Sequence, residues 1–264
     1  MIVDGRSIAR KIFERTKARA QRLPHPPKVV ALAGSKTLAT RSYLKIKSAR
    51  AIDAGCVFEA RELKSPFGDA NCVLVQLPLP SGTDQKEICD SIPLEKDADV
   101  LSTAAREKFR KGAAGALLPP VVAAMRDICA LHNVEPEGKK AAVVGKGWLV
   151  GDPAAVWLRQ QGAEVSILTS GDDLSAALRA ADIIVSGAGS PRLITPDMLK
   201  EGVVLIDAGT SESGGIVVGD ADPACATKCS LFTPVPGGVG PVAVACLFEN
   251  AVILTERGTK GIDK

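Results

Sequence analysis

The chain has 264 residues, of which 46% are hydrophobic and 24% charged, so it can build a substantial core and is not a disordered chain. A length of this order suits one large or two medium domains. The net charge is only +3 and aromatic residues make up 3%, so we expect no nucleic-acid partner. We see no secretion signal and no run approaching the ~18 apolar residues of a membrane span. We therefore expect a cytoplasmic protein with no membrane partner.

The cysteines and histidines indicate buried thiols and no metal site. There are seven cysteines, an odd number that favours reduced thiols in the absence of a secretion signal. Cys225 and Cys229 lack the two-residue spacing of a zinc knuckle, and His25 and His132 are isolated. We interpret the cysteines as small core residues.

The first half of the chain alternates helical and strand patterns. In chain order we expect a helix over 7–23, a strand over 29–34, a helix over about 40–54 closed by Gly55, an apolar strand over 73–80, a short helix over 83–92, and a strand-like start or end in 93–100. Two prolines end the 73–80 segment, because proline cannot continue a central ladder. Gln76 should therefore lie near a strand end, where sites form in α/β sheets.

The second half shows a more regular alternation. We expect strands over 141–144, 165–168, 183–185 and 203–206, helices from the glycine turn to Gly162 and over 174–180, and a last apolar helix over about 240–257. Strands that alternate with helices of this length form a parallel sheet with right-handed crossovers. The predicted fold class is α/β, with a doubly wound, Rossmann-type parallel sheet.

A glycine-rich turn runs from Gly145 to Gly151, between an apolar strand and a helix. In this context such a turn binds a dinucleotide, because its glycines let backbone amides approach the pyrophosphate and the helix N-terminus favours the negative charge. A tight turn without a ligand would have the same pattern. Thr169-Ser170, rather than an acidic residue, follows the next strand, and Lys146 could meet a 2′-phosphate, which favours NADP. Asp172 and Asp173 lie close by, so NAD is also possible.

Tyr43 and Lys47 stand four residues apart on the second predicted helix, so both side chains leave the same face. A lysine with a lowered pKa can exchange protons with a substrate, and a tyrosine can stack on a flat ring. The alternative is a solvated basic helix, because other basic residues are close. The tyrosine–lysine spacing of short-chain dehydrogenases follows the nucleotide-binding turn, whereas this pair precedes it, so we assign the pair to a different lobe and chemistry.

Four motifs occur together in one order. They are Tyr43-Leu-Lys-Ile-Lys47, Val75-Gln-Leu-Pro-Leu-Pro80, Lys96-Asp-Ala-Asp99 and Thr233-Pro-Val-Pro-Gly-Gly-Val-Gly-Pro241. The chain resembles the bifunctional methylenetetrahydrofolate dehydrogenase/cyclohydrolase family over nearly its whole length. The resemblance implies oxidation of 5,10-methylenetetrahydrofolate with NADP and hydrolysis of the product to 10-formyltetrahydrofolate, a role in one-carbon metabolism and purine biosynthesis. It also implies a homodimer.

The resemblance further implies a domain organisation and a set of site residues. Residues 1–118 would form the folate lobe, 119–237 the Rossmann NAD(P)-binding lobe, and 238–264 a helix that returns to the first lobe. Lys47 matches the catalytic lysine and Gln76 its polar partner. Tyr43 would stack on the folate and Asp99 would hold the pterin. Further substrate contacts would come from Leu77, Pro78, Gly237, Gly238 and Pro241. Cofactor contacts would come from Gly145, Lys146, Gly147, Val150, Gly151, Ser170 and Thr210.

The chain departs from the family pattern in its loops. The segment between Gly55 and Val75 is shorter and lacks a helix, and the downstream Asn-x-Gly is absent. Residues that differ from the family's are Val100 for a glycine, Pro119-Pro120-Val121-Val122 for Pro-Cys-Thr-Pro, Gly147 for a serine and Ala243 for a threonine. Two hypotheses follow: a minimal but active enzyme, or a divergent paralogue that keeps one activity or only binds folate or dinucleotide. We favour the first, because Tyr43, Lys47, Gln76 and Asp99 are all retained.

Overall fold

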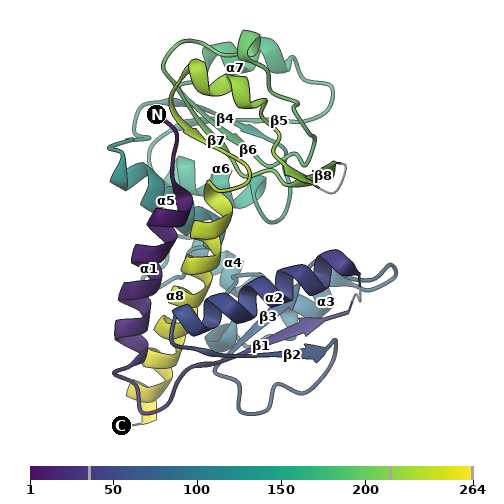
Figure 1. Ribbon diagram of the computed structural model, residues 1–264, viewed down its shortest axis with the longest axis vertical. Helices are drawn as coiled ribbons and strands as arrows, with labels where there is room; N and C mark the ends of the chain where they lie inside the picture. The colour runs from purple at the N-terminus through teal and green to yellow at the C-terminus, as the bar shows by residue number, and fades with distance from the viewer. Residues whose placement is uncertain (35–36, 214–215, 263–264) are drawn as a thin grey trace. The chain divides into compact units, whose positions relative to one another are not determined.

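The computed structural model describes residues 1–34, 37–213 and 216–262, and the chain divides into two compact units. Unit 1 comprises residues 1–8 and 121–243, and unit 2 comprises residues 9–120 and those from 244 onwards. The boundaries fall within or at the ends of three helices, α1 (Gly5–Ala20), α5 (Pro120–Leu131) and α8 (Val239–Ile262) (Figure 1).

Unit 1 is built on a parallel sheet. Its five strands lie in the order β10 (Cys229–Thr233), β7 (Val203–Asp207), β6 (Ile183–Ser186), β4 (Lys140–Val144) and β5 (Glu164–Leu168). Helices α6 (Gly151–Gln160) and α7 (Leu174–Ala180) contact these strands (Figure 1). The chain leaves β4 for β5 on one side and returns to β6 on the other. The strand order therefore reverses at β4, and this topological switch point is where doubly wound sheets bind ligands.

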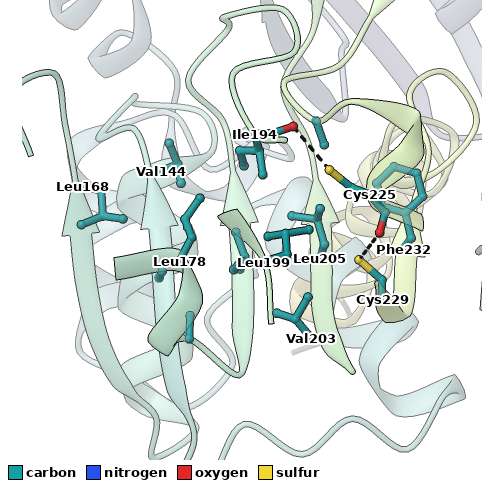
Figure 2. Packing of buried hydrophobic residues seen from close by; sticks show 14 residues of the cluster. Val144, Leu168, Leu178, Ile194, Leu199, Val203, Leu205, Cys225, Cys229 and Phe232 are labelled. Atoms are coloured by element: carbon teal, nitrogen blue, oxygen red, sulfur yellow. Dashed lines mark hydrogen bonds between the residues drawn. The ribbon is translucent and has the colours of Figure 1, made fainter. Parts of the chain in front are cut away.

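A buried apolar cluster on the sheet of unit 1 includes two thiols. Val144, Leu205 and Phe232 belong to one buried cluster on this sheet (Figure 2). Cys225 and Cys229 also belong to it, and their Sγ atoms donate to the carbonyl oxygens of Ile194 and Cys225, at 3.4 and 3.0 Å. All seven cysteines are buried and in the thiol form, which confirms their interpretation as core residues.

The beginning of the chain extends the edge of this sheet. The amide of Val3 donates to the carbonyl of Phe232 at 2.9 Å, and the amide of Phe232 donates to the carbonyl of Met1 at 2.8 Å. A Cβ atom on Gly5 would lie 1.9 Å from the carbonyl oxygen of Gly238. Only glycine fits at position 5, so the first residues are held against the end of the proline- and glycine-rich segment.

Unit 2 contains a three-stranded parallel sheet in the order β2 (Val57–Glu62), β1 (Lys28–Ala33), β3 (Cys72–Gln76). Helix α2 (Leu38–Asp53) contacts β2, and the shorter helices α3 (Gln85–Asp90) and α4 (Thr103–Arg110) contact each other. The hydroxyl oxygen of Thr37 caps α2 by accepting from the amide of Thr40, and Gly55, with φ of 73°, follows its end. Glycine adopts this conformation without a steric penalty.

Helix α8 packs along α1 within unit 2. Arg15 makes a bidentate ion pair with Glu249, and Arg19 pairs with Glu256 at 2.6 Å. The segment Val239–Thr259 is long and apolar enough to cross a membrane, so the expectation that no segment approaches that length was wrong. Of its most apolar stretch, 61% is buried within the protein, as in a helix that forms part of a core.

Most predicted elements are confirmed, with shifts of a few residues at their ends. Residues 93–100 are an exception, because a 3-10 helix, Leu94–Lys96, and a single bridge at Asp97 replace the expected strand. Pro93 precedes this turn of helix, and the charged residues after it do not suit a buried strand. Elements that the sequence patterns did not predict are β2, α4, α5, β10 and the antiparallel hairpin of β8 (Ser211–Ser213) and β9 (Ile216–Val218).

Candidate active site and dinucleotide turn

Tyr43 and Lys47 lie on one face of α2, as the four-residue spacing predicted. The Tyr43 ring is 44% exposed, so its face is accessible to a flat ligand. Lys47 is half-buried, in contrast to its exposed neighbour Lys45. The face that carries Tyr43 and Lys47 is therefore not a uniformly solvated basic surface.

Lys47 is joined to the end of strand β3 through Gln76. Its Nζ atom donates to Oε1 of Gln76 at 3.0 Å. Gln76 is buried at the last position of β3, and its Nε2 atom donates to the carbonyl of Leu77 at 2.7 Å. Because Nε2 of Gln76 is hydrogen-bonded to the backbone, the Oε1 atom of Gln76 is the one that faces Lys47.

Asp99 completes the polar group around Lys47. Burial raises the pKa of the Asp99 carboxyl to about 6, and the positive charge of Lys47 opposes the rise. Burial lowers the pKa of Lys47, and the negative charge of Asp99 opposes that change. Desolvation disfavours the charged form of each group while their mutual attraction favours it. The pKa of each group is therefore shifted toward neutrality from that of a free side chain, as is common at functional sites.

The two aspartates of the Lys96-Asp-Ala-Asp99 motif have different surroundings. Asp97 is buried, and its two carboxylate oxygens accept from the amides of Leu101 and Ser102 at 3.1 and 2.7 Å. It stabilises the loop that carries Asp99. Val100, next to Asp99, has φ of 56°, a region that is a genuine outlier for a β-branched residue. The backbone is thus strained beside Asp99, by about 1–2 kcal/mol.

In unit 1 the glycine turn lies at the switch point of the sheet. Gly145 directly follows β4, has φ of 91°, and its amide donates to the carbonyl of Leu168 at 2.8 Å. A Cβ atom on Gly151 would lie 2.0 Å from the carbonyl oxygen of Gly145, whereas one on Gly147 would meet only ordinary contacts. Gly145 and Gly151 are therefore required by the fold of the turn, and Gly147 is exposed to solvent.

The turn leads into the N-terminus of helix α6. Val150 occupies the N-cap position of α6 and supplies no capping hydrogen bond. Lys146 is exposed in the same turn. The positive end of the helix dipole favours an anion, although the Asp152 carboxylate in the first turn partly offsets this and the Asp152 amide already donates to the carbonyl of Gly147 at 3.1 Å. The turn fits the pyrophosphate of a dinucleotide.

The other predicted cofactor residues follow two further strands of the same sheet. Ser170 comes after β5 and Thr210 after β7, so both lie beyond the carboxyl ends of the parallel strands, the edge that also holds Gly145. Asp172 accepts from the Thr169 amide at 2.6 Å, and Asp173 caps α7 by accepting from the Ala176 amide. These two acids therefore have local structural partners.

Gly237, Gly238 and Pro241 belong to unit 1, whereas the lysine, glutamine and aspartate belong to unit 2. Gly237 has φ of 112°. A Cβ atom on Gly238 would lie 2.7 Å from the carbonyl oxygen of Pro234, so the segment admits only glycine there. Leu77 and Pro78 directly follow Gln76 in unit 2, and Pro78 is exposed. A cavity of about 550 Å³ elsewhere in unit 2 is lined by none of the predicted site residues.

Sequence reasoning missed the loop after β6 and the buried acid that holds it. Residues 187–190 contact the glycine turn, and Asp220 accepts hydrogen bonds from the loop. The glycine content of Ser186-Gly-Ala-Gly-Ser190, directly after a predicted strand, was the available signal.

Unit 1 is a doubly wound sheet with a glycine turn at its switch point, and unit 2 carries a lysine, an amide and a carboxylate close together. These features are those of a dinucleotide-dependent enzyme. Residues 119–259 match the model of the tetrahydrofolate dehydrogenase/cyclohydrolase NAD(P)-binding domain. The chain belongs to the tetrahydrofolate dehydrogenase/cyclohydrolase family.

Similar proteins cover the whole chain. The bifunctional protein FolD of Moorella thermoacetica is 35% identical, and the match spans 97% of this chain and 99% of that protein. Among solved structures, the bifunctional FolD of Campylobacter jejuni superposes with a TM-score of 0.92 at 29% identity, covering 98% and 99% of the two chains. The Trypanosoma brucei enzyme, solved with NADP and an inhibitor, has a TM-score of 0.91 at 27% identity and covers 98% of each chain.

Proposed function

We propose that the chain oxidises 5,10-methylenetetrahydrofolate to the 5,10-methenyl cation with NADP and hydrolyses the cation to 10-formyltetrahydrofolate. The observation that carries this proposal is the hydrogen bond between Lys47 and Gln76, with the carboxyl of Asp99 beside it. Names of similar proteins, including dehydrogenase/cyclohydrolases of bacteria and a trypanosome, support it.

In this proposal the folate lobe is unit 2, residues 9–120 and those from 244 onwards. Tyr43 stacks its exposed ring on the pterin, and Asp99, ionised above about pH 6, accepts hydrogen bonds from the pterin's N–H groups. Backbone atoms around Leu77 and Pro78, in the same unit, provide further substrate contacts. The accessible aromatic face and the desolvated carboxylate are the two features that support this orientation.

Hydrolysis of the methenyl cation consumes one water and releases one proton. Lys47, whose pKa is lowered by burial, takes a proton from the attacking water in its neutral form. Gln76 holds the Nζ atom in place because its own amide is fixed by the Leu77 carbonyl. Oxidation, by contrast, needs mainly orientation of the two reactants.

Residues 119–237 form the dinucleotide lobe of the proposal. NADP, when bound, accepts a hydride from the methylene carbon. The glycine turn, including Gly145, Gly147 and Gly151, would hold the pyrophosphate with the N-terminus of α6 at Val150. Lys146 and Ser170 would face the 2′-phosphate, and Thr210 would contact the cofactor from the end of β7. Asp172 and Asp173 have local partners, which favours NADP over NAD.

A spectrophotometric assay with methylenetetrahydrofolate and either NADP or NAD tests the function. Reduced cofactor and methenyl absorbance are followed separately. We expect reduced cofactor with no lasting methenyl absorbance. Persistent methenyl product would indicate a paralogue that has lost the hydrolase, an alternative that the departures at Val100 and Gly147 favour. If neither nucleotide is reduced and added methenyl substrate is not hydrolysed, the protein is not this enzyme.

The proposal extends to location and assembly. We propose that the protein works in the cytoplasm, in one-carbon metabolism that supplies purine biosynthesis, and forms a homodimer through its dinucleotide lobe. Ile216 and Val217, two exposed apolar residues on the hairpin of β8 and β9, support a contact there. Light scattering on a size-exclusion column tests this, because Ile216→Asp should convert a dimer into a monomer.

A further inference from the structure

A buried carboxylate, Asp220, organises the loop that follows β6. Its Oδ2 atom accepts from the hydroxyl of Ser186 at 2.7 Å and from the amides of Ala188 and Gly189 at 2.7 and 3.3 Å. Its Oδ1 atom accepts from the amide of Ser190 at 2.8 Å. Asp220 lies between β9 and a 3-10 helix, far from this loop in sequence, and is completely buried.

Three of these donors are consecutive backbone amides. Successive N–H groups that point to one centre form an anion-binding concavity of the kind that holds phosphate in other proteins. Here the Asp220 carboxylate occupies the concavity. An ionised carboxylate accepts hydrogen bonds and donates none, so it matches four converging donors. The loop of residues 187–190 is therefore shaped by an internal anion.

The same loop packs against the glycine turn. A Cβ atom on Gly145 would lie 3.0 Å from the carbonyl oxygen of Gly187 and 3.1 Å from Cα of Ala188. In the other direction, a Cβ atom on Gly187 would lie 2.4 Å from the side chain of Val150. The backbone of the loop thus contacts both the first glycine of the turn and the N-cap residue of α6.

Asp220 is itself fixed by a second buried acid. Asp207, the last residue of β7, accepts from the amides of Gly209 and Asp220 through Oδ1, at 3.0 and 3.3 Å, and from the amide of Ala221 through Oδ2, at 2.9 Å. Hydrogen bonds thus connect the end of β7 to Asp220, and Asp220 to the loop after β6. That loop in turn packs against the turn after β4.

We infer that Asp220 is a positioning residue for the dinucleotide site. Its hydrogen bonds fix the loop of residues 187–190, and this loop packs against Gly145 and Val150 and so fixes the glycine turn. The inference rests on the proposed dinucleotide binding at that turn. It deepens the proposed function, because affinity for NADP then depends on a residue that does not itself contact the turn. Replacing the carboxylate by an amide would place an N–H donor among donors, so Asp220→Asn should release part of the loop.

The test compares Asp220→Asn with wild-type protein in three measurements. We expect the dissociation constant for NADP, measured by calorimetry, to rise about tenfold or more, as for the loss of one or two charged hydrogen bonds. Hydrolysis of methenyltetrahydrofolate without dinucleotide should stay within about twofold. Acrylamide should quench Trp148 more strongly, because that residue lies in the turn and is 36% exposed, whereas Trp157 is only 4% exposed and contributes little.

Asp222→Asn is the matched control, because the side chain of Asp222 accepts a hydrogen bond from the amide of Ala224, within its own segment. It should leave all three measurements unchanged. If Asp220→Asn does not fold, Ser186→Ala removes one of the four donors and should give a smaller change in the same direction. Equal losses of NADP binding and hydrolysis, or unchanged NADP binding and Trp148 quenching, would overturn the inference. If wild-type protein binds no dinucleotide, the proposed function fails, while Trp148 quenching still decides the role of Asp220.

Discussion

The Nζ atom of Lys47 lies 3.0 Å from the amide oxygen of Gln76, and this single contact joins the middle of α2 to the end of β3. The Leu77 carbonyl sets the orientation of the Gln76 amide by accepting from its Nε2 atom, so the Oε1 atom of Gln76 faces Lys47. A lysine that is half-buried, held at one point and close to a carboxylate can transfer protons repeatedly without losing its position.

Lys47→Met should suppress hydrolysis of the methenyl cation by about a hundredfold or more, because it removes the proton-transferring group while keeping the length of the side chain. Oxidation of methylenetetrahydrofolate should suffer less. The rate of decay of methenyl absorbance above the uncatalysed rate measures the effect. Lys45→Met, on the exposed part of the same helix, should retain full hydrolysis. Undiminished hydrolysis in Lys47→Met would refute the assignment.

Gln76→Glu should place a negative charge beside Lys47 and raise the pKa of the lysine, because an opposite charge favours the protonated form. The fraction of neutral lysine at neutral pH then falls, so hydrolysis should slow by about tenfold or more and recover partly at higher pH. The pH profile of hydrolysis measures this shift. Gln76→Met, which adds no charge, should lower the rate without moving the profile. A profile that stays in place in Gln76→Glu would show that Lys47 does not act as the base.

Folate binding should weaken as the pH falls through about 6, where burial places the pKa of Asp99. The shift is upward from the usual value near 3.8, so the carboxylate is ionised above about pH 6 and becomes neutral below it. KM for methylenetetrahydrofolate should therefore rise on the acid side. In Asp99→Asn the KM should be high and independent of pH over this range. A KM in wild-type protein that is constant from pH 7 to 5 would contradict the role of Asp99.

Lys146→Ala should raise KM for NADP by about tenfold and leave KM for NAD nearly unchanged, because only NADP carries the 2′-phosphate that the lysine would meet. Initial rates with the two nucleotides measure the ratio. Lys139→Ala, an exposed lysine before β4, serves as the control and should alter neither value. Equal changes for both nucleotides would assign Lys146 to the pyrophosphate instead.

The sequence predicted strands β4, β5, β6 and β7 of unit 1 because they are short apolar runs with helical or turn segments between them. Strand β2 was missed for the opposite reason. As the edge strand of a small sheet it is half exposed, and charged residues such as Glu59 and Arg61, which pair with each other at 2.7 Å, hide the strand pattern. Edge strands commonly carry such charges.

The position of a site residue was predictable where a single helix or strand determines it. The common face of Tyr43 and Lys47 follows from helical spacing, and the position of Gln76 follows from the prolines that end its strand. The contact between Lys47 and Gln76 could not be predicted from the residues alone, because it depends on how α2 packs on the sheet. Nor could the role of Asp220, because its partners follow a different strand.

The first residues of the chain pair with β10, so Met1 and Val3 contact Phe232 across almost the full length of the sequence. Unit 2 likewise needs residues beyond 243. On a ribosome, unit 1 cannot be completed before Phe232 is made, nor unit 2 before the residues beyond 243, and the segment 9–120 must wait without its last helix. We therefore expect the two units to acquire their native structure late and close together in time, rather than one after the other as in a chain of consecutive domains.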